Sequence, residues 1–170
     1  MRWVTTTCFA LILACLPLNL VQAASYSIPM DNSVAEINVP DSWNPNSSDL
    51  GVDAVSPDNK LFFSIYATTN DDEKLALHEA SKIAMNGDVL QIDIKSLDAK
   101  TVNIGNVPSH QYAYNATYNG KPGYLVINLA KVSTGGYLQI IRWGTRKSFK
   151  MNYSGTIKMF TTLKLLGQTK

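Results

Sequence analysis

The feature that most constrains the fold is a run of three strand-like segments between His110 and Gly144. Two short connections, Asn119-Gly120 and Ser133-Thr134-Gly135-Gly136, join these segments. Such connections favour β-hairpins, because glycine and asparagine tolerate the positive φ angles of tight turns. Leu125 and Ile127 mark one face of the middle segment. The sequence therefore predicts an antiparallel meander at the centre of the fold.

Further strands are predicted on the N-terminal side of the meander. The segment at 61–68 alternates regularly, and a shorter segment at 35–39 ends at Pro40. The region 44–58 is rich in Asn, Ser, Asp and Pro, which indicates a loop with a short extended piece around 51–55. Another strand is expected to begin at Leu90.

A helix is predicted between these strands and the meander. Asn70 is a good N-cap, and Glu73 three residues later completes a capping box. Gly87 is expected to end the helix. The residues predicted to form its apolar stripe are Ala76, Ala80, Ile83 and Ala84.

A second amphipathic helix is predicted from about Lys147 to Leu163, weakened at Gly155 by roughly 1 kcal/mol relative to alanine. The residues expected to pack on the sheet are Phe149, Tyr153, Ile157, Phe160 and Leu163. The predicted fold class is thus α+β: a central antiparallel β-sheet, with an amphipathic helix before the meander and another at the C-terminus packed on it.

The first 23 residues are typical of an export signal. Arg2 supplies a positive start, Val4–Val21 is mostly apolar and uncharged, and small residues precede a cleavage site after Ala23. An uncleaved membrane anchor is the alternative, but polar residues dilute the run needed for a spanning helix. A lipoprotein cut before Cys15 also stays open. We expect a periplasmic or secreted protein.

The remaining residues, 24–170, are expected to form a single domain. Both cysteines, Cys8 and Cys15, lie in the signal, so no disulfide is expected. The whole chain has 15 basic and 13 acidic residues, a balance that argues against nucleic acid as the main partner. Every acidic residue lies at or before Asp98, whereas ten basic residues follow from Lys100 onward.

The order of these elements resembles that of a known group of exported domains. The strand Ile37-Asn38-Val39 runs into Pro40-Asp41-Ser42-Trp43, and an acidic-capped helix, a meander and a C-terminal helix follow. This arrangement resembles the PsbP-like and DcrB-like family of small exported domains. The resemblance implies a central antiparallel sheet with helices packed against it. It also implies accessory or binding roles, and it supplies no catalytic residues.

Catalytic and metal-binding motifs are not recognised in the sequence. His78-Glu79 begins like a zinc-protease motif, but Lys82 stands where a second histidine is needed. His110 stands alone, so no metal site and no cofactor are expected. A weak surface calcium site at Asp49, Asp53 and Asp58 stays open, although their spacing does not match a calcium loop.

Two groups of residues are candidates for partner binding. Cations at the start of a helix are unfavourable because they oppose the helix dipole. A basic cluster in such a place can therefore mark a binding surface for an acidic partner. The alternative is a basic turn that is simply solvated. This cluster comprises Arg142, Arg146, Lys147 and Lys150. Tyr112 and Tyr114 belong to a set of strand aromatics that fits either an exposed binding face or the rim of a helix-covered core.

These observations favour an exported, non-catalytic binding or accessory protein that acts on a protein partner, with no membrane span in its mature part. The alternative is a carrier that holds a small apolar ligand between sheet and helix. Such a carrier predicts a cavity lined by residues such as Phe63, Tyr66 and Phe160. An enzyme ranks third, because no nucleophile, base and orienting group can be assembled from known motifs.

Overall fold

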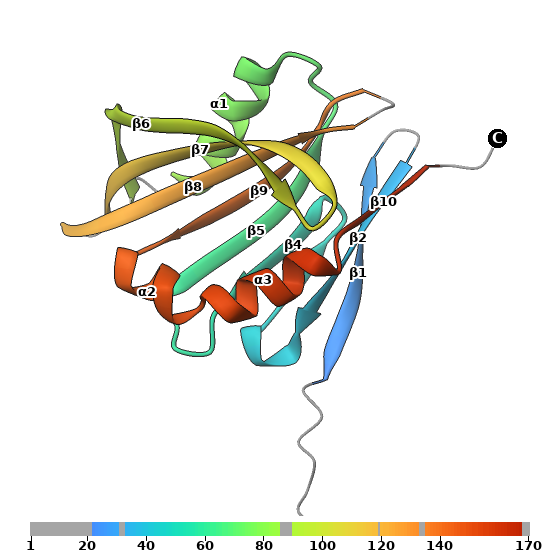
Figure 1. Ribbon diagram of the computed structural model, residues 1–170, viewed down its shortest axis with the longest axis horizontal. Helices are drawn as coiled ribbons and strands as arrows, with labels where there is room; N and C mark the ends of the chain where they lie inside the picture. The colour runs from blue at the N-terminus through green and yellow to red at the C-terminus, as the bar shows by residue number, and fades with distance from the viewer. Residues whose placement is uncertain (1–21, 31–32, 86–89, 119, 133–134, 168–170) are drawn as a thin grey trace, which may run out of the picture.

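The computed structural model describes residues 22–30, 33–85, 90–118, 120–132 and 135–167 (Figure 1). Several sequence predictions lie outside these residues. They concern the export signal up to residue 21 with both cysteines, the helix stop at Gly87, Asn119 of the first turn, and residues 133–134 of the second.

The predicted meander is present. Its strands are β7 (Val107–Tyr118), β8 (Lys121–Lys131) and β9 (Tyr137–Gly144). All of their pairings are antiparallel. Gly120 and Gly136 have φ angles of 73° and 77°, the positive values expected of the turns.

The meander is the centre of a seven-stranded antiparallel sheet of order β3-β4-β5-β9-β8-β7-β6. The predicted strand 61–68 is β5 (Leu61–Thr68) and the short piece is β4 (Gly51–Val55). β3 (Asn46–Ser48) forms one edge. The opposite edge is β6 (Leu90–Ile104), whose pairing with β7 shifts register between Asp93 and Asp98. Such an irregularity limits further pairing along an exposed edge.

A second, three-stranded sheet has the order β1-β2-β10. β2 (Ser33–Pro40) contains the predicted strand and leads into a 3-10 turn, Asp41–Trp43. β1 (Ala23–Met30) and β10 (Lys164–Gly167) were not predicted. β10 has only four residues, too few to show the alternation of apolar and polar residues that predicts a strand. Pairing with β2 holds β10 in its extended conformation.

The first helix, α1 (Glu73–Ala84), is capped two residues later than predicted, at Asp72 and not at Asn70. Its N-cap is Asp72, whose carboxylate accepts hydrogen bonds from the backbone N–H groups of the next turn. A carboxylate suits this position because it also lies at the positive end of the helix dipole. The Asn70 side chain instead donates to Glu79.

The apolar stripe of α1 is narrower than predicted. Ala76, Ala80 and Ala84 are buried, whereas Ile83 is 38% exposed. Residues four apart share one face of a helix, and Ile83 lies at the margin of that face. The small alanines allow α1 to pack closely on β8 and β9.

The C-terminal helix, predicted as one element, is two. α2 (Arg146–Met151) and α3 (Tyr153–Thr161) meet at Asn152. The Asn152 side-chain amide donates to the Ser148 carbonyl and to the Asp58 carboxylate, so this junction is tied to the loop before β5.

This break changes which C-terminal residues are buried. Phe160 and Leu163 are buried as predicted, but Tyr153 and Ile157 are exposed. A β-carbon at Gly155 would lie 3.1 Å from the Trp43 ring. The glycine therefore allows α3 to lie against Trp43, a packing role that offsets its low helix propensity.

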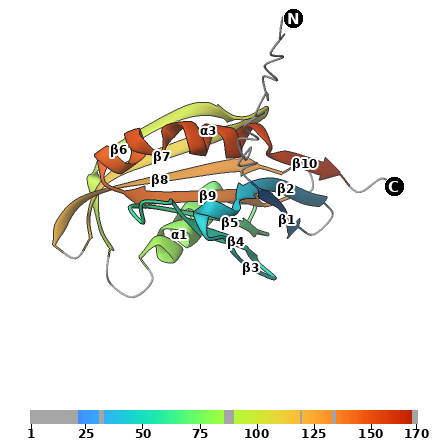
Figure 2. The same ribbon diagram turned by 90° about the horizontal axis from the view of Figure 1, so that it is seen from below.

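The helices cover opposite faces of the large sheet (Figure 2). One core lies on the α3 side and contains Phe63, Ile65, Ile140 and Phe160. The other lies on the α1 side and contains Leu125, Ile127, Ile141 and the alanines of α1. Alternation along β8 and β9 assigns neighbouring residues to the two cores. The predicted α+β class, with an antiparallel sheet and packed helices, is confirmed.

Candidate functional site

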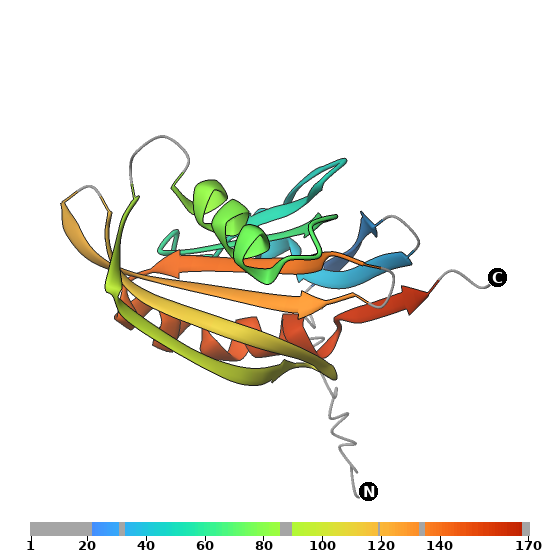
Figure 3. The same ribbon diagram turned by 90° about the horizontal axis from the view of Figure 1, so that it is seen from above.

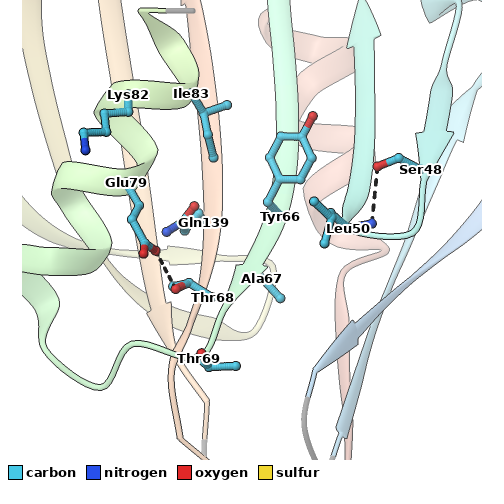
Figure 4. Close-up of a pocket in the computed structure, with 10 residues that line it drawn as sticks. All are labelled: Ser48, Leu50, Tyr66, Ala67, Thr68, Thr69, Glu79, Lys82, Ile83 and Gln139. Carbon is cyan, nitrogen blue, oxygen red and sulfur yellow. Dashed lines mark hydrogen bonds between the residues drawn. The ribbon is translucent and has the colours of Figure 1, made fainter.

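A groove of about 740 Å³ lies between α1 and the strands at one side of the large sheet (Figure 4). Figure 3 shows the β3–β4 hairpin projecting beside α1, so that the two elements flank β5. The lining residues are Ser48, Leu50, Tyr66, Ala67, Thr68, Thr69, Glu79, Lys82, Ile83 and Gln139.

The narrow apolar stripe of α1 explains why this groove is open. The helix packs on β8 and β9, and it leaves the β3–β4 side of the sheet uncovered. Leu50, in the β3–β4 turn, is 71% exposed as a result, and Ile83 faces it from α1. Two large aliphatic side chains thus stand on opposite walls.

Hydrogen bonds within the protein fix the polar groups of the groove. The Tyr66 hydroxyl donates to Asp53 at 2.6 Å, and Ser64 donates to the same carboxylate at 2.5 Å. Burial and this carboxylate raise the pKa of Tyr66 well above its usual value. On the other wall, Glu79 accepts from Thr68 at 2.6 Å. The groove is consequently preformed, because its polar groups hold one another in place.

A second polar cluster lies where α1 begins. One oxygen of Glu73 accepts from the Tyr112 hydroxyl and contacts His110 Nδ1, each at 2.5 Å. Burial raises the pKa of Glu73, but the contacts with Tyr112 and His110 outweigh it and hold that pKa below its usual value. Asp72 opposes the charge of Glu73, and Lys131 attracts it. The cluster ties α1 to β7.

These contacts predict a pH dependence of stability. Because the pKa of Glu73 is lower in the folded state, its contribution is present above the usual glutamate pKa and is lost as pH falls through the folded value. When the pH falls from about 5 to 3, the free energy of unfolding should decrease less for Glu73→Gln than for the parent protein. The difference should be about 1 kcal/mol or less, since the pair is partly exposed. Urea titrations at each pH measure it, and parallel curves would contradict the assignment.

The predicted basic cluster is placed around α2. Arg146, Lys147 and Lys150 are exposed, and Arg146 and Lys147 open the helix as expected. Arg146 donates to the Asn115 side chain at 2.9 Å, and its guanidinium lies 4.4 Å from the centre of the Tyr124 ring. Arg142, by contrast, lies beneath the helices on β9 and is half-buried.

The two predicted tyrosines lie on the other face of the sheet. Tyr114 is buried in the core beneath α1, and Tyr112 packs against the same core. Of the wider aromatic set, Tyr137 and Trp143 also belong to this face. The structure therefore brings the four basic residues together around α2 and separates them from Tyr112 and Tyr114.

The groove was not predicted from the sequence. Leu50 falls in a loop-like stretch between Asp49 and Gly51, where an isolated apolar residue carries no period. Ile83 has helical spacing, which predicts a buried position in the apolar stripe of the helix. The sequence signal for an exposed Leu50 is an apolar residue next to a turn glycine, Gly51, and this signal is weak.

A metal site needs several ligating side chains within reach of one ion. Within the described part of the chain, no three His, Cys, Asp or Glu side chains come together in such an arrangement. Asp53 and Asp58, two of the three aspartates considered for calcium, accept hydrogen bonds from Ser64 and Ser56 respectively. Over the same residues, no helix is long and apolar enough to cross a membrane.

The architecture is similar to that of solved structures. The solution structure of the cyanobacterial PsbP (CyanoP) from Synechocystis sp. PCC 6803 superposes with a TM-score of 0.55 and 10% identity, covering 90% of this chain and 98% of that one. LpqN of Mycobacterium tuberculosis, described as involved in cell envelope biogenesis, gives 0.52 and 15%, covering 87% and 92%.

These likenesses show the fold, and they confirm the PsbP-like resemblance seen in the sequence. No protein-family model matches the chain. No curated protein matches it in sequence either.

Proposed function

We propose that this protein is a non-catalytic accessory protein of the cell envelope that binds a protein partner in the groove between α1 and the β3–β4 hairpin. The observation that carries the proposal is the pair of exposed aliphatic side chains, Leu50 and Ile83, on opposite walls of the groove. Exposed apolar surface with a polar surround is typical of protein interaction sites.

The polar groups beside this pair suit a partner that adds hydrogen bonds at the margin. Glu79 and Lys82 stand within about one helical turn of Ile83 on α1. Gln139 is buried and donates to the Ala76 carbonyl at 3.1 Å, so it holds α1 on β9 beneath these groups. An apolar anchor with a polar rim is the usual anatomy of an interface.

The export signal and the fold support the location. An n-region, an apolar run and a small-residue cleavage site at the start of a chain are typical of exported proteins. The structural neighbour LpqN is described as involved in cell envelope biogenesis, and CyanoP is a PsbP. From the export-signal pattern together with the fold, we infer that this protein acts in the periplasm or after secretion.

The alternative carrier has less support. Phe63 and Phe160 pack in the core beneath α3, with ring centres 6.3 Å apart, whereas Tyr66 lies on the opposite face of the sheet. The three residues named for a ligand cavity therefore do not line a common space.

Site-specific photo-crosslinking in the native compartment tests the proposed groove. A photoreactive phenylalanine analogue at Leu50 should capture one recurrent protein, and the same analogue at Leu166, an exposed leucine on β10, should not. Identical capture at both positions, or capture at neither, would count against the groove as the binding site.

The partner recovered in this way allows a matched comparison. Ile83→Asp is expected to weaken its affinity about tenfold or more, since it places a charge on the apolar wall. Ile157→Asp is the control, because Ile157 is also helical and 40% exposed but lies on α3, across the sheet. Equal affinities for the two variants would overturn the proposal.

A further inference from the structure

Arg142 is a half-buried cation that no carboxylate neutralises. It lies on β9 beneath α2 and α3, and it forms no ion pair with any described residue. Its guanidinium is 4.9 Å from the ring centre of Phe160 and 5.8 Å from that of Phe149. Burial lowers the pKa of Arg142 to about 10. An uncompensated charge in such a place is costly, so its retention requires an explanation.

The hydrogen bonds of Arg142 are incomplete as well. One terminal nitrogen donates to the Asn128 side-chain oxygen at 2.9 Å, and this contact fixes the plane of the guanidinium. The Nε atom is buried and has no hydrogen-bond partner among the described residues. A guanidinium with a free Nε–H presents donors in the fork that matches a carboxylate.

A cavity of about 470 Å³ adjoins this guanidinium. Its lining residues come from the meander and from the two C-terminal helices. These helices lie on the face of the sheet opposite α1 (Figure 2). Tyr124, Val126, Phe149 and Tyr153 line it, and Lys150 adds a second cation. The volume is within the range of small-molecule sites, and the walls are mainly aromatic and aliphatic.

The uneven charge distribution of the sequence persists at this site. All the residues that line the cavity lie beyond Asp98, in the half of the chain that contains no carboxylate. β7, β8, β9, α2 and α3 together form its walls, so the nearest elements have no acidic residue with which to neutralise Arg142. The Asp58 carboxylate contacts Asn152 at the junction of α2 and α3, but it forms no ion pair with Arg142. An acidic ligand from outside the chain would supply the missing carboxylate.

We propose that this cavity is a binding site for a small carboxylate with an apolar body, held by Arg142 and Lys150 at its charged end and by the aromatic walls along the rest. The site is separate from the groove beside α1 and independent of the protein partner proposed there. An apolar ligand between sheet and helix was one expectation from the sequence; the unpaired guanidinium adds the requirement for an anionic group.

Calorimetric titration of the mature protein with 4-phenylbutyrate tests this site, with 4-phenylbutanamide as the neutral counterpart. The acid should bind at least tenfold more tightly than the amide, because only the acid provides the charged acceptor. Equal binding of both, or no binding of the acid, would overturn the proposal.

Two charge reversals on α2 localise the site. Lys150→Glu places a carboxylate at the cavity, where it competes with the ligand for Arg142, and should weaken binding of the acid at least tenfold. Lys147→Glu makes the same change in charge on the same helix, at a residue that does not line the cavity, and should change affinity by threefold or less. Both lysines are exposed, so both variants are expected to fold. Equal losses would indicate non-specific electrostatic attraction and contradict the site.

Arg142→Met then tests the guanidinium itself. Methionine fills similar space without charge, and the acid should bind this variant no better than the amide does. Lys82→Met, which removes a cation from the groove across the sheet, should leave binding of the acid unchanged. Unchanged binding of the acid by Arg142→Met would contradict the assignment of Arg142.

Discussion

Gly136→Ala is expected to lower the free energy of unfolding by about 3 kcal/mol or more. Gly136 has a φ angle of 77°, which is unfavourable for alanine, and a β-carbon built there would lie 1.9 Å from the backbone oxygen of Thr68. The obstacle is backbone, so the turn between β8 and β9 must shift. The backbone N–H of Gly136 donates to the Asp71 carboxylate at 2.8 Å, and a shift of the turn would also disturb this hydrogen bond. For a domain of this size, the melting temperature should fall by roughly 6–12 °C.

Gly120→Ala separates the two contributions to this loss. Gly120 has a similar φ angle, 73°, but nothing lies within 4 Å of a β-carbon placed there. Only the backbone conformation is penalised, so the expected cost is about 1 kcal/mol. Thermal unfolding of the two variants side by side measures the difference. Equal losses would show that the close approach to Thr68 does not constrain the turn.

Local patterns were sufficient to predict most of the sheet. β5 and the meander have regular alternation and turn residues with specific dihedral preferences, which are properties of short segments. The break at Asn152 was not predictable in this way, because it depends on hydrogen bonding to Asp58, a residue distant in sequence. β10 likewise depends on its pairing with β2.

The candidate site was less accessible to sequence reasoning than the fold. Whether Tyr112 and Tyr124 share a face depends on the register of β7 against β8, and in the structure they lie on opposite faces. The exposure of Leu50 and Ile83 depends on how far α1 covers the sheet. By contrast, the absence of acidic residues beyond Asp98 was visible at once, although its consequence for Arg142 required the position of the C-terminal helices.

Phe63→Ala is expected to lower the free energy of unfolding by about 3–5 kcal/mol. Phe63 is 1% exposed, packs near Phe160 beneath α3, and would leave a cavity that neighbouring strands cannot fill. Phe62→Ala is the matched control, one residue away on the other face of β5. The Phe62 ring stacks on Trp143 at 3.7 Å but is half-buried, so we expect a cost of about 1–2 kcal/mol.

The same pair of variants distinguishes a packed core from a carrier cavity at Phe63. If Phe63 lined a space kept open for an apolar ligand, its truncation would remove few contacts in the free protein, and the cost would approach that of Phe62→Ala. A packed core gives the larger loss, because every contact of the ring is with the protein itself. Urea unfolding of the ligand-free protein provides the comparison. A loss at Phe63 no greater than that at Phe62 would indicate an open space at Phe63, separate from the cavity beside Arg142.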